Sequence, residues 1–237
     1  MIISSVRGSI LLAAAIGGFA IPLGAADLPT TPSAGKAVNK ALILRAEKAF
    51  SSGNLQEADA LYTKALEESG DSASLLVSLA AVKTRLGKTA ESTALLRRAL
   101  KLDLNSAPAW LLLGMNALEQ KNDAEALADL MQAAYLDDRN PRAHNFLGIA
   151  AGRKGWSDVS EQELRRAVEL NPEYADANFN LAVFYLGRTP PLAEQARRHY
   201  QRALDLGTQR DPVLEARLVK AVAAPSASIP QAPGTQE

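Results

Sequence analysis

Cysteine is absent from the 237 residues of this chain, and aromatic residues make up only 5% of it. Without cysteine, the chain has no disulfide bond, thiol nucleophile, cysteine zinc site or lipid-modified cysteine of a bacterial lipoprotein. An excess of one charge is also missing, because 26 basic residues balance 26 acidic residues and the two signs are interspersed. A chain without a broad electrostatic field is a poor candidate for binding nucleic acid or an anionic membrane surface.

The N-terminal segment has the composition of an export signal. Arg7 precedes an uncharged apolar run from Ile10 to Leu23, and small residues follow that run. The run is shorter than the roughly 20 residues that a membrane-spanning helix needs, so a signal peptide over residues 1–26, removed after Ala26, is the preferred interpretation. An uncleaved membrane anchor formed by residues 8–23 is the alternative. Both interpretations place the folded part outside the cytoplasm, in the periplasm or in the medium.

Two further segments have little apolar content and several helix-breaking residues. Residues 27–38 contain two prolines and a glycine, and residues 225–237 contain three prolines and no aromatic residue. Such compositions rarely bury enough apolar surface to fold. The sequence therefore predicts a flexible linker over 27–38 and a disordered tail over 225–237.

Between these segments the same residue types recur every 34 positions, which indicates a structural repeat. Small residues recur at Ala46, Ala80, Gly114, Gly148 and Ala182, and leucine precedes the last four of them at Leu79, Leu113, Leu147 and Leu181. Further series are Ala58, Ser92, Ala126 and Ser160, then Tyr62, Leu96, Leu130 and Leu164, then Ala65, Ala99, Ala133 and Ala167. Within a unit these positions lie three, four and seven residues apart, so they share one face of a helix. Each unit is predicted to contain two helices.

Glycine marks the break between the two helices of a unit. Gly53, Gly87 and Gly155 stand at the same phase, and Lys121 takes this place in the third unit. Glycine adopts the left-handed backbone that ends a helix at little cost. Asn140 with Pro141 is typical of the start of a helix and marks a break between units.

These residues resemble the tetratricopeptide repeat family. The closest match to its motif is the third unit, with Trp110, Leu113, Gly114, Ala126, Leu130 and Ala133. The resemblance implies an all-α fold: a right-handed α-solenoid of about five helix pairs with a C-terminal capping helix. The predicted repeats span residues 39–72, 73–106, 107–140, 141–174 and 175–210.

The end units depart from the motif. The fifth unit is two residues longer than the others, and the surplus falls at Gly187 to Pro191, where two prolines predict a longer loop. In the first unit, Arg45 stands where the leucine series expects a core residue. Residues 211–224 are predicted to form the capping helix that such stacks require. Its expected apolar stripe is Val213, Leu214, Leu218 and Val222.

The resemblance also implies a binding surface, because in this family the first helix of each repeat lines a concave wall. Carried onto this sequence, the wall contains Val77, Ala81, Thr84, Leu111, Met115, Leu118, Arg142, Asn145, Ile149, Phe179 and Val183. Arg85, Glu119 and Arg153 lie near its rim. Most wall residues are apolar or small, so a partner helix or peptide is expected to bind there. The alternative is that neighbouring residues, or the proline-rich tail, already cover them.

The family's carboxylate clamp of Lys, Asn and Arg is absent, because the corresponding positions hold Ile43, Val77 and Leu111. His144 and His199 have no partners at metal-ligand spacing, so neither a metal site nor a histidine base is expected. Gly152 to Gly155 follow no predicted strand, which argues against a phosphate loop.

The sequence therefore predicts a non-catalytic interaction scaffold or adaptor of the cell envelope, without a cofactor, that binds a protein or peptide. Two alternatives stay open. One is a membrane-tethered structural subunit whose outer helix faces bind larger machinery while its groove is filled internally. The other is an accessory subunit of an enzyme complex, with catalysis supplied by a partner.

Overall fold

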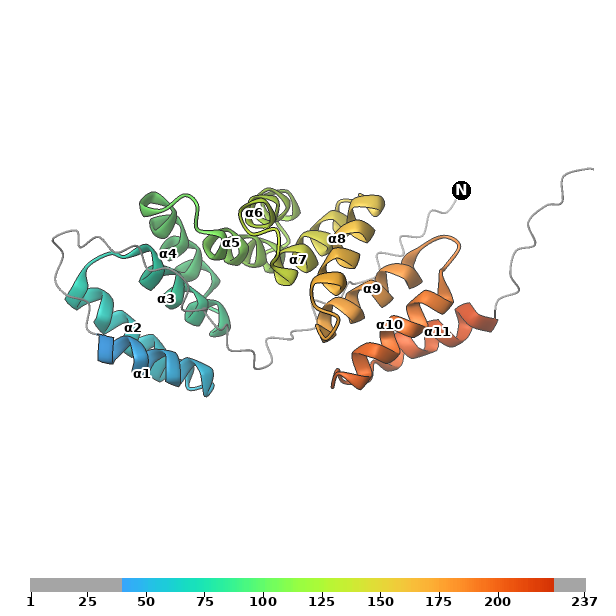
Figure 1. The fold of residues 1–237 in the computed structure, drawn as a ribbon, viewed down its shortest axis with the longest axis horizontal. Coiled ribbons are helices and arrows are strands. Elements are labelled where there is room, and N and C mark those ends of the chain that lie inside the picture. The colour runs from blue at the N-terminus through green and yellow to red at the C-terminus, as the bar shows by residue number, and fades with distance from the viewer. Residues whose placement is uncertain (1–39, 224–237) are drawn as a thin grey trace, which may run out of the picture. The chain divides into compact units, whose positions relative to one another are not determined.

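A computed structural model describes residues 40–223 (Figure 1), and these residues form eleven α-helices and no strand. The predicted all-α class is confirmed. The predicted signal peptide (1–26), linker (27–38) and tail (225–237) lie outside the described residues.

The helices belong to two compact units, one ending at Pro172 and the other beginning at Glu173. The first unit contains four helix pairs: α1 (Lys40–Ser51) with α2 (Leu55–Ser69), α3 (Ala73–Arg85) with α4 (Thr89–Leu102), α5 (Ala107–Glu119) with α6 (Asp123–Leu136), and α7 (Pro141–Arg153) with α8 (Ser157–Leu170). The second unit contains the pair α9 (Ala175–Gly187) and α10 (Ala193–Asp205), followed by α11 (Pro212–Ala223).

Local sequence explains where the helices begin and end. The first helices of four pairs start at residues 73, 107, 141 and 175, which are 34 residues apart. At the start of α7, the Asn140 side-chain oxygen accepts hydrogen bonds from the backbone N–H groups of Arg142 (3.0 Å) and Ala143 (3.4 Å). Pro141 has no backbone N–H that would need a partner in this first turn.

The turns between paired helices use a left-handed residue, as the sequence predicts. Gly53, Gly87 and Gly155 have φ between 72° and 79°, and Lys121 adopts the same region with φ 60°. In the first four pairs the turn spans three residues (52–54, 86–88, 120–122 and 154–156). In the fifth pair it spans five (188–192), so the two surplus residues lie in this loop and the flanking helices are intact.

Small residues set the distance between paired helices. A Cβ atom placed on Gly148 would lie 2.7 Å from Cγ of Leu164 on the facing helix, and a Cβ on Gly114 would collide with Leu130 in the same way. The paired helices therefore approach so closely that a side chain at either glycine would push them apart.

Buried apolar residues of the first unit form two clusters. One cluster contains buried residues of α1 to α5, and the other contains buried residues of α5 to α7. Trp110 and Met115 of α5 are partly buried and pack against both clusters. These two side chains of α5 therefore connect the clusters.

The last helix, α11, corrects one expectation. Leu214 and Leu218 are buried, but Val213 is 67% exposed and Val222 is 57% exposed. The predicted apolar stripe is therefore only half correct, because no helix within residues 40–223 covers these two valines. With Val219 also 71% exposed, the outer face of α11 lacks the polar character expected of a capping helix.

Candidate functional site

Most residues predicted to line the concave wall are buried against neighbours. The buried members are Val77, Ala81, Leu111, Leu118, Asn145, Ile149 and Phe179, and the half-buried members are Thr84, Met115, Arg142 and Val183. Val77 and Ala81 belong to the first core cluster, and Leu111, Leu118 and Ile149 to the second. Only the four half-buried side chains therefore offer much surface to a partner, and binding through this set stays a prediction.

Hydrogen bonds fix one polar part of the predicted wall. Thr84 Oγ1 donates to the side-chain oxygen of Asn116 (3.1 Å) and lies 2.8 Å from Ser92 Oγ. Asn116 Nδ2 in turn donates to Ser92 (2.9 Å) and Thr93 (3.3 Å). Asn116 and Ser92 are buried, so this network joins α3, α4 and α5 where unpaired polar groups would be costly.

The two rim arginines are engaged in helix capping. Arg85 Nη1 donates to the carbonyl of Phe50 at 3.2 Å, and Arg153 Nη1 donates to the carbonyl of Leu118 at 2.8 Å. Each guanidinium therefore meets the C-terminal end of a preceding first helix, where carbonyls lack helical partners and a cation is favoured. The rim residue Glu119 accepts a hydrogen bond from Thr89.

The structure reveals a recurring pair of positions that the sequence analysis missed. The fourth residue of each repeat lies on the first helix, and the residue 19 positions later, or 21 later in the fifth repeat, lies on the second helix. We call these the paired positions: Leu42 and Leu61, Leu76 and Leu95, Trp110 and Asp129, His144 and Glu163, and Asn178 and His199. Applying the 34-residue period to polar residues would have found them.

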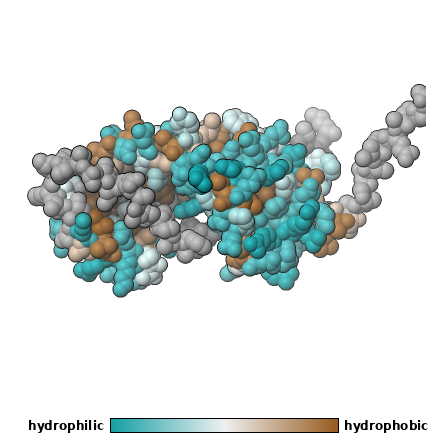
Figure 2. Space-filling view, in the orientation of Figure 1, coloured by the Kyte–Doolittle hydropathy of each residue, from teal (hydrophilic) through white to brown (hydrophobic). Residues whose placement is uncertain are grey.

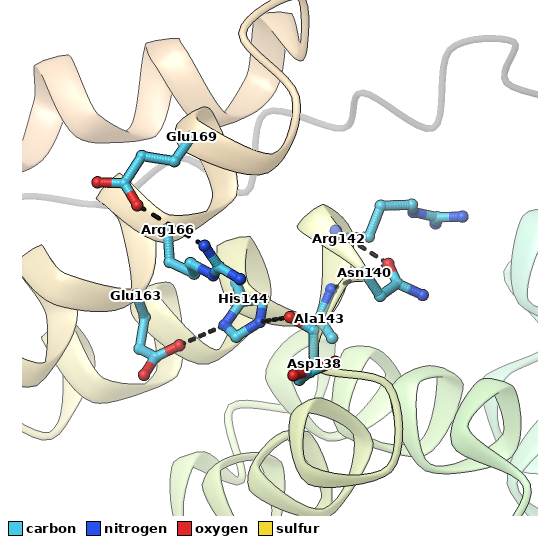
Figure 3. A network of polar contacts seen from close by, with 8 residues as sticks. All are labelled: Asp138, Asn140, Arg142, Ala143, His144, Glu163, Arg166 and Glu169. Carbon is cyan, nitrogen blue, oxygen red and sulfur yellow. Dashed lines mark hydrogen bonds and ion pairs between the residues drawn. The ribbon is translucent and has the colours of Figure 1, made fainter.

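In the fourth repeat the paired positions form a largely buried ion pair (Figure 3). His144 Nδ1 lies 2.6 Å from Oε2 of Glu163, and Nε2 lies 2.9 Å from the backbone carbonyl of Asp138. Both neighbours accept hydrogen bonds, so both ring nitrogens donate and the ring carries a proton on each. The hydrogen bond to Glu163 raises the pKa of His144 above its usual 6.5, burial opposes this, and the Asp138 carbonyl adds to the rise.

In the fifth repeat, within the second unit, the paired positions are also polar. His199 Nδ1 lies 3.1 Å from the side-chain oxygen of Asn178. Asn178 is buried and its Nδ2 donates to the carbonyl of Tyr174 (3.1 Å). Both histidines therefore make hydrogen bonds within their own helix pairs.

In the third repeat the two paired side chains, Trp110 and Asp129, form no hydrogen bond with each other. The indole N–H of Trp110 donates to the carbonyl of Leu104 (2.9 Å) rather than to Asp129. Asp129 is only 9% exposed, and it lines a hollow together with Trp110. Burial and, after it, the nearby Glu125 raise the pKa of Asp129 to about 6, while Arg97 opposes the rise.

Exposed apolar side chains of the described residues lie mainly on second helices, in the loops beside them and on α11, and Leu44 on the first helix α1 is also 64% exposed. Tyr135 is 81% exposed, and Leu102, Leu104 and Met131 are also exposed. Figure 2 shows that the hydrophobic areas visible on one face are separated by hydrophilic ones. Among the described helices, none combines the length and apolar composition needed to cross a membrane. Acidic and histidine side chains of residues 40–223 form no group suited to a metal ion.

Comparison with known sequences gives the same family at three places in the chain. Sequence models of the tetratricopeptide repeat match residues 49–113, 107–140 and 146–211. These ranges together cover more than half of the 237 residues. Among curated proteins, none matches the chain.

Several solved structures share this fold. A thermophilic tetratricopeptide repeat protein of Thermus thermophilus, TTC0263, is 20% identical with a TM-score of 0.62, over 77% of this chain and 98% of that one. PilF of Pseudomonas aeruginosa is 23% identical with a TM-score of 0.67, over 77% and 83%. YrrB, described as having an unusual peptide-binding site, is 24% identical with a TM-score of 0.56, over 76% and 90%.

Proposed function

Because this chain belongs to the tetratricopeptide repeat family, we propose that it is a non-catalytic scaffold or adaptor of the cell envelope that binds a protein partner along its first helices. The family match carries this proposal, since stacked helix pairs present extended surfaces that suit peptides and helices. The peptide-binding site named for YrrB supports it by analogy of fold.

Within the first unit, Met115 and Arg142 are the side chains best placed to contact a partner. They come from the first helices of consecutive repeats, and Nη2 of Arg142 lies 3.9 Å from the sulfur of Met115. Both side chains are half-buried, and Met115 also packs against both core clusters. Methionine adapts its shape to varied apolar surfaces, and arginine donates hydrogen bonds to peptide carbonyls.

Crosslinking in the native envelope, followed by purification of the chain and its attached proteins, tests this proposal. The test variant is Met115→Glu/Arg142→Glu, which adds negative charge to the first-helix surface while leaving buried residues unchanged. The matched control is Met131→Glu/Arg139→Glu, which changes the same residue types at exposed positions on α6 and in the loop after it. We expect a partner that is recovered with the wild type and the control and lost with the test variant.

A second candidate is a structural subunit that binds through its outer helix faces. The burial of seven predicted wall residues favours it, as does the exposure of Met131 (53%) and Tyr135 (81%) on α6. The same experiment separates the two candidates. Loss of the partner with the control variant and retention with the test variant would assign binding to the outer face instead.

The envelope location rests on the N-terminal sequence and has its own test. N-terminal sequencing of the exported protein should give Asp27 as the first residue if the signal peptide is removed. A chain beginning at Met1 or Ile2 in the membrane fraction would instead support the anchored alternative.

A further inference from the structure

A hollow lies beside the paired positions of the third repeat, Trp110 and Asp129, which form no hydrogen bond with each other. It lies among α4, α5 and α6 and has a volume of about 390 Å³. Trp110, Leu113, Leu104 and Leu100 form its apolar side, and the cationic side chains of Arg97 and Lys101 also line it. Asp129 and Glu125, one helical turn apart on α6, form its acidic side. An apolar wall beside the carboxylate of Asp129 suits a side chain with an aliphatic stem and a cationic end.

Asp129 is the one acidic side chain of the paired positions that lacks a partner within the described chain. Glu163 has His144 at 2.6 Å in the equivalent place of the next repeat, whereas no hydrogen bond or ion pair to Asp129 is formed by residues 40–223. Asp129 is nevertheless only 9% exposed. A buried carboxylate without a partner is unfavourable, and its raised pKa of about 6 reflects the same burial.

The chain's own groups do not complete this site. Trp110 uses its N–H for the Leu104 carbonyl, so it presents no donor to Asp129. Arg97 extends toward Glu125 with its Nη2 at 3.2 Å from Oε1, and its side chain is 64% exposed. The carboxylate of Asp129 therefore faces the hollow with an unused capacity to accept hydrogen bonds from a cation.

We propose that this hollow binds an arginine side chain of the partner protein, with the guanidinium on the carboxylate of Asp129 and the methylene stem against Trp110 and Leu104. Arginine suits the site better than lysine, since its planar guanidinium forks onto carboxylates, stacks on indole rings and is more weakly hydrated. The inference rests on the proposed function, because it identifies a side chain of the partner.

Nuclear magnetic resonance titration of the full chain with short peptides tests this inference directly. The probe is acetyl-Gly-Arg-Gly-amide, and the matched control peptide carries citrulline, which keeps the shape of arginine but is neutral. The indole N–H signal of Trp110 reports on the hollow, and that of Trp156 is an internal reference. We expect a saturable shift of the Trp110 signal with the arginine peptide and binding at least about tenfold weaker with the citrulline peptide.

Three variants make the test specific to Asp129. Asp129→Asn removes the charge with little change of shape and should abolish the difference between the two peptides. Asp129→Leu introduces the residue found at the equivalent positions Leu61 and Leu95. It should raise the melting temperature while abolishing binding, which separates loss of the site from loss of folding. Glu163→Gln, the same position in the next repeat, should leave peptide binding unchanged.

Equal affinity for the citrulline and arginine peptides would overturn the inference, as would unchanged binding by Asp129→Asn or tighter binding of the corresponding lysine peptide. A shift of the Trp156 signal equal to that of Trp110 would show unspecific association and would also overturn it. These outcomes leave the proposed function standing, because that depends on partner recovery by the Met115→Glu/Arg142→Glu variant.

Discussion

At the scale of single residues, the paired positions hold different kinds of side chain from one repeat to the next. The first two repeats fill it with leucines, the third with Trp110 and Asp129, and the fourth with the ion pair of His144 and Glu163. Because these positions lie at the same place in every repeat, the side-chain types alone decide whether the contact is apolar, is an ion pair or leaves a carboxylate without a partner. Asp129 in the third repeat and the ion pair in the fourth are largely buried, which makes each of them sensitive to pH or to substitution.

The titration of His144 is the first prediction. Its pKa in the folded state is raised by Glu163, so its stabilising contribution is complete below pH 6.5 and is lost as pH rises through the higher, folded-state pKa. We expect Glu163→Gln to lower the pKa of His144 and to weaken this loss of stability at rising pH. Histidine signals followed by nuclear magnetic resonance measure the pKa, and His199 is an internal control. An unchanged pKa of His144 in the variant would contradict the assignment.

At the scale of helices, the close approach within each pair depends on small residues at one phase. Gly114 faces Leu130 and Gly148 faces Leu164, while the equivalent Ala80 and Ala182 are fully buried in their own pairs. The turn that joins the two helices depends on a left-handed residue, which is glycine in three pairs. Packing distance and turn geometry are therefore set by separate residues.

Gly114→Val is expected to destabilise the protein by about 1–3 kcal/mol, because the added side chain collides with Leu130 and forces α5 and α6 apart. Urea unfolding measures the loss. Ala128→Val, on the exposed face of α6, introduces the same branched side chain without a collision and should cost roughly half a kcal/mol. Equal effects of the two changes would show that the close approach is not important for stability.

Lys121→Gly is expected to stabilise the protein, in contrast to Gly114→Val. Lys121 has φ 60°, where a side chain is strained by about 1–2 kcal/mol and glycine is not. The unfolded chain gains flexibility with glycine, so the net stabilisation should be a few tenths of a kcal/mol to about 1 kcal/mol. Thermal unfolding at neutral pH measures it. The reverse change at the equivalent turn, Gly87→Lys, should be destabilising.

At the scale of the whole molecule, stability is distributed along neighbouring helix pairs. Within the first unit, α3 packs against α2, α4 and α5, and α7 packs against α5, α6 and α8. The two core clusters follow the same division. A disturbance in one helix should therefore weaken its neighbours before it reaches distant pairs.

Leu76→Ala tests this distribution. Leu76 is fully buried in α3, and its truncation should cost about 2–5 kcal/mol. We expect amide hydrogen exchange to accelerate most in α2 to α5 and least in α7 and α8. Leu130→Ala in α6 is the matched change in the second cluster and should accelerate exchange most in α5 to α8 and least in α1 and α2. Uniform acceleration over both clusters in both variants would contradict a stack stabilised by neighbours.

The sequence by itself determined the helices, their period and their turns. These follow from local rules: Ala126, Leu130 and Ala133 share one helix face, Gly87 ends a first helix, and the prolines at 190 and 191 lengthen one loop. The tertiary structure decided which surfaces are free. Leu111 and Phe179 have the phase of a concave wall, yet they are buried, because exposure depends on side chains from other helices that the period does not specify. The incomplete site at Asp129 also required the structure, since a missing partner is visible only once all neighbours are placed.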